Sequence, residues 1–97
     1  MGKKDGEGSE IYIDSDGKSN YVGQFIYDKK HGKGVYQCAA YTYNGEFDKG
    51  QVNGYGKMTW TGGKKLYTGD WYMGKRHGKG RYEKKGQFMY ETFFFLL

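Results

Sequence analysis

The run from Gly69 to Arg76 begins like a loop that binds nucleotide phosphates. Gly69-x-x-x-x-Gly74-Lys75 has the glycine spacing and the lysine of such a loop, whose backbone N–H groups surround the phosphates. Arg76, however, stands where Ser or Thr should supply a hydroxyl to magnesium. A phosphate loop also leads into a helix, whereas a second glycine-rich strand is expected here. We therefore predict no nucleotide site.

Metal-binding or nucleophilic chemistry would need His, Cys and acidic side chains to converge. His31 and His77 occupy equivalent positions in two copies of a repeated unit, and Cys38 is the only cysteine. A tetrahedral metal site needs more ligands than these, and no Ser, Cys and His residues are spaced for covalent catalysis. Glu46 and Asp70 are expected on a polar sheet face without a matched partner. The sequence predicts no enzyme activity, no cofactor and no metal, and the two histidines are expected to close hairpin turns.

All these residues except Cys38 lie inside a unit that the chain repeats three times. The unit reads Tyr-x-Gly-x-aromatic, then six residues, then Gly-x-Gly-x-large. Its first and last residues are 15 positions apart in every copy: Tyr21 and Tyr36, Tyr43 and Met58, Tyr67 and Tyr82. A repeat of roughly 20 to 50 residues indicates a linear array in which each unit packs on its neighbours.

The residues inside a unit alternate with the period of a β-strand. Period-2 alternation places Tyr21, Gly23 and Phe25 on one face of a strand, and the six following residues favour a hairpin loop. Aromatic rings that lie over facing glycines would offset the loss of packed side chains there. The predicted antiparallel pairs are Tyr21 with Tyr36, Gly23 with Gly34 and Phe25 with Gly32, and likewise Phe47 with Gly54 and Trp71 with Gly78.

The pattern resembles the MORN (membrane occupation and recognition nexus) repeat, whose units read approximately Tyr-x-Gly-x-Trp, a short turn, and Gly-x-Gly-x-Tyr. Phe25 and Phe47 replace the tryptophan, Met58 replaces the closing tyrosine, and Asn53 stands where the other copies have histidine. The resemblance implies an all-β fold: an elongated single-layer antiparallel sheet of consecutive β-hairpins. We expect a partial N-terminal repeat or cap at 1–20, three repeats at 21–89, and an incomplete repeat with an apolar tail at 90–97. In the N-terminal part, Gly8-x-Glu10-x-Tyr12 is expected to align with Gly32-x-Gly34-x-Tyr36, with Glu10 in a glycine position.

The same resemblance implies a non-enzymatic scaffold or adaptor within a larger protein complex. Its partner would be a helix laid along the sheet or a strand at its edge. The chain is similar to MORN proteins of the radial spoke head, which implies a cytoplasmic location in the cytoskeleton, as in the axoneme of a cilium or flagellum. Large aromatic side chains give contact area at low entropic cost. The predicted partner-binding residues are Tyr21, Phe25, Tyr43, Phe47, Tyr67 and Trp71.

An alternative is attachment to a membrane surface that contains anionic phospholipids such as phosphoinositides. The net charge is +5, and loop cations could gather at one rim of the sheet. The candidates are Lys29, Lys30, Lys64, Lys65, Lys75, Arg76, Lys84 and Lys85. Nucleic acid is not an expected partner, because Lys33, Lys57, Lys79 and Arg81 are predicted to point away from the aromatic face on which bases would stack.

Composition sets the remaining limits. The chain has 97 residues, 18 glycines, no proline and 36% hydrophobic residues, of which aromatics are more than half. This length allows one domain, and the frequent aromatics argue against disorder. The single cysteine excludes an internal disulfide and favours a reducing compartment. The sequence contains no stretch typical of a signal peptide or long enough to span a bilayer, so we expect an intracellular protein.

Overall fold

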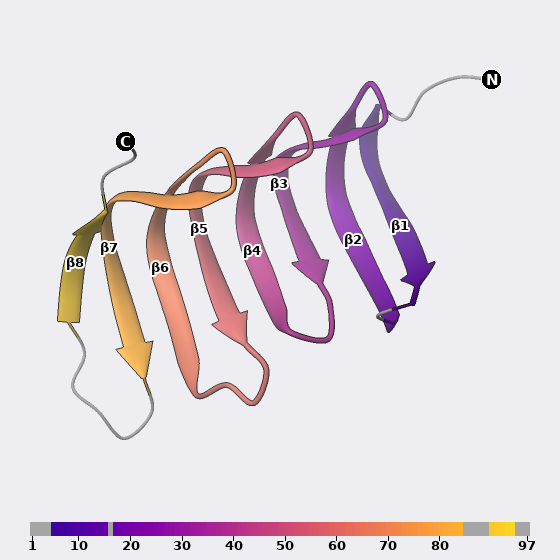
Figure 1. Cartoon of the computed structure of the whole chain (residues 1–97). Helices are drawn as coiled ribbons and strands as arrows, with labels where there is room; N and C mark the ends of the chain where they lie inside the picture. The colour runs from indigo at the N-terminus through magenta and orange to yellow at the C-terminus, as the bar shows by residue number, and fades with distance from the viewer. Residues whose placement is uncertain (1–4, 16, 85–89, 95–97) are drawn as a thin grey trace.

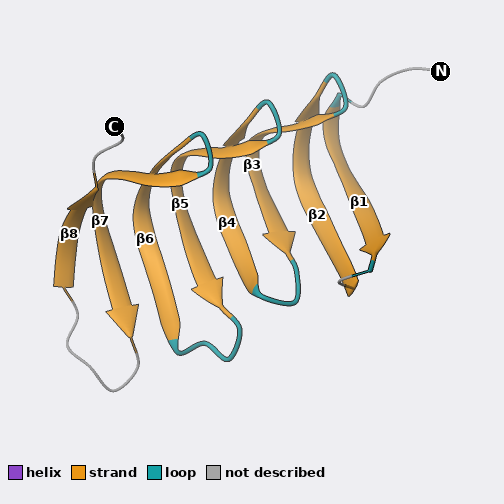
Figure 2. Ribbon diagram, in the orientation of Figure 1, coloured by secondary structure: helices purple, strands orange, loops and turns teal. Residues whose placement is uncertain are grey.

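The computed structural model describes residues 5–15, 17–84 and 90–94, which form eight β-strands (Figure 1). Loops lie only at the two ends of the strands (Figure 2). The strands are β1 (Gly6–Asp14), β2 (Gly17–Ile26), β3 (Lys29–Gln37), β4 (Tyr41–Asp48), β5 (Gln51–Trp60), β6 (Lys65–Tyr72), β7 (Lys75–Lys84) and β8 (Tyr90–Phe94).

The eight strands form one antiparallel sheet in sequence order, from β1 to β8. Each strand pairs with its sequence neighbours, and no helix occurs in the part of the chain that the structure describes. The molecule measures 50 × 28 × 22 Å. The predicted fold, an elongated all-β sheet of consecutive hairpins, is therefore confirmed.

Two rows of equivalent residues cross the sheet at right angles to the strands. The pairing within each hairpin agrees with the prediction at these rows, and the pairing between hairpins extends them. The glycine row is Gly8, Gly23, Gly34, Gly45, Gly56, Gly69 and Gly80, and the adjacent row is Glu10, Tyr21, Tyr36, Tyr43, Met58, Tyr67 and Tyr82.

The predicted third pair of each hairpin is wrong, because a β-bulge follows the glycine row. Phe25 pairs with Lys30, and Gly32 pairs instead with Phe47 of the next hairpin. The same shift gives Phe47 with Val52 and Trp71 with Arg76. The expected six-residue loop is thus a two-residue turn followed by bulged strand.

The hairpin turns require positive φ angles at both central positions. These are Tyr27 and Asp28 (φ 49° and 65°), Lys49 and Gly50 (50° and 87°), and Met73 and Gly74 (49° and 84°). Such two-residue turns match the right-handed twist of the strands that they join. Beyond each turn, β3, β5 and β7 first run across the end of the sheet and then bend down into it (Figure 1).

The second and third turns are also bonded to the preceding hairpin. The N–H of Gly50 donates to the carbonyl of Lys30 over 2.9 Å, and that of Gly74 donates to Val52 over 2.8 Å. The N–H of Met73 donates to Oδ1 of Asn53 over 2.9 Å. These bonds connect successive hairpins at their turn ends, in addition to the ladder between them.

The N-terminal strand differs from its expected alignment. Gly8, not Glu10, lies in the glycine row opposite Gly23, and Glu10 lies opposite Tyr21. The expected alignment was therefore wrong by two residues, an even number that leaves the same side chains on the same face. At the other end, β8 pairs with β7 as an edge strand. Residues 95–97 of the predicted apolar tail lie outside the described part of the chain.

Candidate interaction surface

Three tyrosine rings cover the glycine pairs on one face of the sheet. A Cβ atom added to Gly34 or Gly56 would overlap the ring of Tyr21 or Tyr43, respectively. Tyr67 covers Gly80 in the same way. Glycine weakens a strand by about 0.5–1 kcal/mol relative to alanine, and the covering rings compensate for this weakness.

The hydroxyl of each tyrosine donates to a backbone carbonyl at the bulge. Tyr21 donates to Gln24 over 2.8 Å, Tyr43 to Glu46 over 3.1 Å, and Tyr67 to Asp70 over 3.4 Å. Burial raises the pKa of all three tyrosines above the ordinary value of 10.0. These rings therefore fix both the bare glycine backbone and the bulge beside it.

The rings form a continuous series of edge-to-face contacts along the sheet. Tyr21 contacts Phe25 and Phe47 at centroid distances of 5.1 Å, and Tyr43 contacts Phe47 at 5.2 Å. Trp71 continues the series, with Tyr43 at 5.6 Å and Tyr67 at 5.3 Å. Tyr21 and Tyr43 thus each contact one ring of their own hairpin and one ring of the next hairpin.

These six side chains, here called the inner aromatic row, are the predicted partner-binding residues. The structure brings all six together on one face, but they are only 0–6% exposed: Tyr21, Phe25, Tyr43, Phe47, Tyr67 and Trp71. The Nε1–H of Trp71 also donates to the carbonyl of Gly56 over 3.3 Å. Direct binding by these residues stays a prediction. Their burial indicates that their main role is to hold the sheet, since they form its core.

A second set of aromatic side chains lies on the same face and is only partly buried. Tyr36 and Tyr41 have ring centroids 5.9 Å apart, and Trp60 and Tyr82 have centroids 6.3 Å apart. All four pack against the buried core, which consists of the inner aromatic row and Met58. We call this set the aromatic ledge: Tyr36, Tyr41, Trp60 and Tyr82.

The sequence prediction missed Tyr41 and Trp60, although a signal for them exists. Tyr41 lies two residues before Tyr43 and Trp60 two residues after Met58, so the period-2 pattern places both on the aromatic face. They pair directly across β4 and β5. Extending the alternation by one step beyond the repeated motif would have found them.

Comparison with known protein families matches the MORN repeat to residues 1–17, 21–42, 43–65 and 67–89. The chain belongs to the MORN repeat family. Its last three matched segments each cover most of one hairpin: β2 with β3, β4 with β5, and β6 with β7. A search of curated proteins gave no match. Repeats of this family are generally modules that bind proteins or lipids, and the radial spoke likeness stays a prediction.

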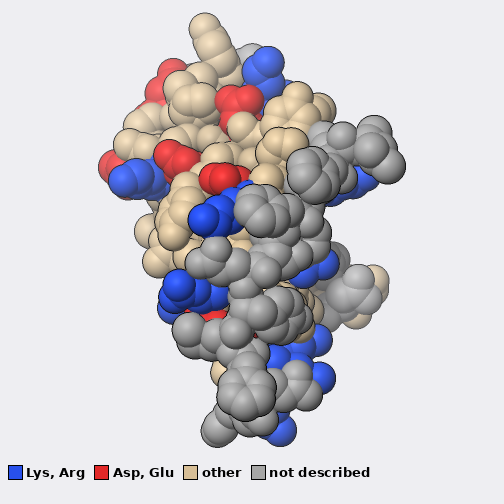
Figure 3. All heavy atoms as spheres, turned by 90° about the vertical axis from the view of Figure 1, so that its left-hand side faces the viewer, with Lys and Arg blue, Asp and Glu red and all other residues tan. Residues whose placement is uncertain are grey.

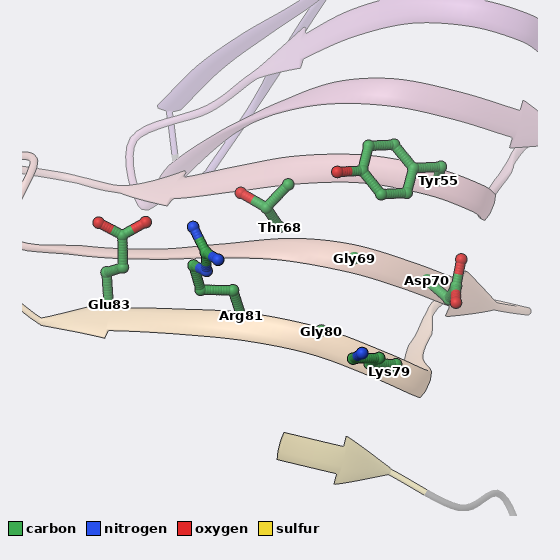
Figure 4. A pocket seen from close by; sticks show the side chains of 8 residues that line it. All are labelled: Tyr55, Thr68, Gly69, Asp70, Lys79, Gly80, Arg81 and Glu83. Carbon is green, nitrogen blue, oxygen red and sulfur yellow. The ribbon is translucent and has the colours of Figure 1, made fainter. Parts of the chain in front are cut away.

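The opposite face of the MORN sheet is polar over its C-terminal half. Thr68 pairs with Arg81, and Lys79 and Arg81 point away from the aromatic face, as predicted. With Tyr55, Asp70 and Glu83 they surround a shallow hollow over Gly69 and Gly80 (Figure 4). Acidic and basic side chains share this hollow, which gives it no strong preference for either sign of charge.

Glu46 on this face has a structural partner, contrary to the expectation. Its Oε1 accepts a hydrogen bond from the N–H of Tyr55 over 2.6 Å. In the first MORN hairpin, Oε1 of Gln24 accepts from the N–H of Lys33 over 2.8 Å. These side chains lie over Gly54 and Gly32, where a Cβ would overlap them. They satisfy backbone groups of the bulge.

The lysines considered for membrane attachment do not gather at one rim. Lys29, Lys30, Lys75 and Arg76 follow the hairpin turns, whereas Lys64, Lys65 and Lys84 lie at the opposite ends of the strands; Lys85 is outside the described residues. Lys30 is also engaged by aromatic rings. Acidic and basic side chains are interspersed in the upper half of the view onto the β8 end of the sheet (Figure 3). The predicted basic rim is therefore wrong.

The residues first considered for nucleotide or metal binding lie in strands and turns of the sheet. Gly69 lies within β6, Gly74 in a turn and Lys75 at the start of β7, so the run is strand, turn and strand, without the helix of a phosphate loop. Nδ1 of His31 lies 3.5 Å from Oδ1 of Asp48, and the ring of His77 packs beside Tyr72 at 5.5 Å. Among the described residues, no three His, Cys, Asp or Glu could hold a metal ion. No helix suited to crossing a membrane occurs among them.

Proposed function

We propose that this MORN protein is a non-enzymatic scaffold or adaptor that binds a partner polypeptide along its aromatic face. The observation that carries the proposal is the aromatic ledge, which presents partly exposed rings from β3 to β7 on one face. The inner aromatic row beneath it is packed and gives the ledge a rigid base. Aromatic side chains on such a base are typical anchors of protein interfaces.

A photocrosslinking comparison of the two faces tests this proposal. A benzophenone amino acid replaces Tyr41 on the ledge or, as the matched control, Tyr55, which is 60% exposed on the opposite face. Crosslinked polypeptides are identified by mass spectrometry, and the complex is then rebuilt from purified components. We expect a specific crosslink from position 41 and weak binding by the double variant Tyr41→Ala with Trp60→Ala. A specific crosslink from position 55 alone would move the binding site to the polar face.

Attachment to anionic lipids is the alternative, and the separated lysines give it less support. Sedimentation with vesicles that contain phosphoinositides, at physiological salt, distinguishes the two functions. We expect no lipid-dependent pelleting. The proposed setting within a cilium or another cytoskeletal complex comes from the family resemblance alone, and localisation of the tagged protein would test it.

A further inference from the structure

The three complete hairpins differ at the residue that pairs with Phe25, Phe47 or Trp71 just after the turn. This residue is Lys30 in the first hairpin, Val52 in the second and Arg76 in the third. The three residues occupy equivalent backbone positions. The identity of the side chain therefore determines what covers the aromatic face next to this residue.

In the first hairpin, the chain's own cation covers the aromatic face. Nζ of Lys30 lies 5.0 Å from the centroid of the Tyr12 ring and 5.5 Å from those of Tyr21 and Tyr36. Cations over aromatic rings within about 6 Å are attracted by them. Burial lowers the pKa of Lys30, which agrees with its position among the rings.

The third hairpin repeats this arrangement with a different cation. The guanidinium of Arg76 lies 5.7 Å from the centroid of the Tyr67 ring. Lys30 and Arg76 are both partly buried. An internal positive charge therefore covers the aromatic face at both outer hairpins.

The middle hairpin carries no cation at this position. Val52 is short and packs against the inner aromatic row, and Met58 stands where the other hairpins have Tyr36 and Tyr82. A groove of about 470 Å³ lies between the middle and third hairpins. It is lined by Tyr41, Met58 and Trp60 of the middle hairpin and by Trp71, Gly74, Lys75 and Arg76 of the third. Val52 adjoins the groove through its hydrogen bond with Gly74.

The charged residues that line this groove in the described part of the chain are all basic. Lys75 and Arg76 line it, and Nζ of Lys65 lies 5.6 Å from the Trp60 ring at its rim. Within the described part of the chain, the lining residues include no Asp or Glu. Its floor is apolar and its border is positive, a combination that attracts acidic groups and disfavours basic ones.

We propose that this groove binds a segment of the partner polypeptide in which an aliphatic or methionine side chain lies between acidic side chains. The apolar side chain would enter between Tyr41, Met58 and Trp60, and the acidic ones would pair with Lys65 and Lys75. This inference rests on the proposed function and narrows it to the groove between the middle and third hairpins and to one kind of sequence. Arg76, which lies over the Tyr67 ring, lines the side of the groove formed by the third hairpin.

The test uses the whole chain and a displayed library of random 12-residue peptides. Selected peptides are sequenced, and their affinities are measured by fluorescence anisotropy against three proteins: the unchanged chain, Val52→Lys and Val35→Lys. Val52→Lys introduces the residue of the first hairpin beside the groove. Val35→Lys makes the same exchange on the polar face, where valine is 36% exposed, and is the matched control.

We expect the selected peptides to contain an apolar residue flanked by acidic ones. Binding should weaken at least tenfold in Val52→Lys, stay unchanged in Val35→Lys, and weaken as salt is raised from 50 to 300 mM because exposed charges are screened. Circular dichroism checks the fold of each variant. Met58→Tyr introduces the residue type that the outer hairpins have at this position and should also reduce binding. It provides the test if Val52→Lys does not fold.

Two results would overturn the inference. One is selection of basic or uncharged peptides; the other is binding that neither Val52→Lys nor Met58→Tyr weakens. In either case, the selected peptides are also tested against Tyr36→Ala and Tyr82→Ala. If these variants bind them more weakly, the aromatic face binds polypeptides and only the assignment to the groove is wrong. Selection of peptides that bind only the polar face would contradict the proposed function as well.

Discussion

The two faces of this one-layer sheet differ in how far they expose their apolar side chains. Tyr21 and Tyr43 are 0% exposed although no second layer covers them, whereas Ile13 and Val22 on the other face are 80% and 54% exposed. The difference does not follow from hydrophobicity, since isoleucine and valine are more apolar than tyrosine. It arises because the glycines leave space on one face, and the rings that fill this space pack against one another.

This comparison teaches that stability is concentrated on one face. Removing side chains from that face should damage the fold, while the other face should tolerate change. The following predictions test the contrast, from the largest expected effect to the smallest.

Substituting a glycine under a tyrosine ring should cause the greatest loss. A Cβ at Gly56 would overlap the ring of Tyr43, so we expect Gly56→Ala to lower the free energy of unfolding by about 3 kcal/mol or to prevent folding. Gly62 is constrained by its backbone instead: its φ of 89° is rare for other residues, and it has open space around it. Gly62→Ala should cost about 1 kcal/mol. Urea denaturation measures both, and equal losses would refute the role of the covering ring.

Truncating a covering ring should cost nearly as much. Tyr43→Ala removes a fully buried ring and two edge-to-face contacts, for a loss of about 3 kcal/mol. Tyr43→Phe removes only the hydrogen bond to Glu46, for about 1 kcal/mol. Val22→Ala on the polar face should change stability by less than about 0.5 kcal/mol. If Val22→Ala proved as harmful as Tyr43→Ala, the two faces would contribute alike.

Raising the pH should weaken the aromatic face. Burial raises the pKa of Tyr21, Tyr43 and Tyr67 in the folded chain, so the unfolded chain loses these protons first. The free energy of unfolding should therefore be unaffected by these tyrosines below pH 10 and fall as the pH rises above it. Lys30 acts in the opposite direction, because burial lowers its pKa.

Denaturation at pH 8 and pH 11 checks this expectation. Tyr43→Phe should reduce the difference between the two pH values, since one of the shifted groups is gone. A difference that is the same with and without the Tyr43 hydroxyl would assign the effect to other groups.

A smaller loss than at the inner aromatic row is expected at the bulge on the polar face. Glu46→Ala removes the acceptor of the Tyr55 N–H at an exposed site, so we expect a cost of about 1 kcal/mol or less. Glu46→Gln should retain most of the stability, because Gln24 makes the equivalent bond in the first hairpin. Thermal unfolding of both variants measures the difference; an alanine variant as stable as the glutamine variant would show that water replaces this bond.

Much of the fold could be predicted because the repeated residues fix the register. Gly23 with Gly34 and Tyr21 with Tyr36 pair as expected. The bulge was missed because Tyr27 and Asp28 do not signal a tight turn, yet both adopt positive φ. The tyrosine hydroxyl bonds that fix the bulge also depend on three-dimensional placement.

The candidate site was predicted only in part. The alternation of Tyr43, Gly45 and Phe47 identified the face on which the aromatic rings gather, but not how deeply they are buried. That burial depends on edge-to-face contacts between successive hairpins. The cover that Lys30 provides requires contacts between β1, β2 and β3, which sequence spacing alone does not reveal.

The shared ring contacts have a consequence for how such a protein could change in length. Because Phe47 contacts both Tyr21 and Tyr43, neighbouring hairpins cannot rotate independently. The sheet is therefore rigid along its length. Duplicating one 22-residue unit would insert two strands and lengthen it by about 10 Å, without disturbing the joints on either side. The number of hairpins would then determine the length of partner polypeptide that the sheet can bind.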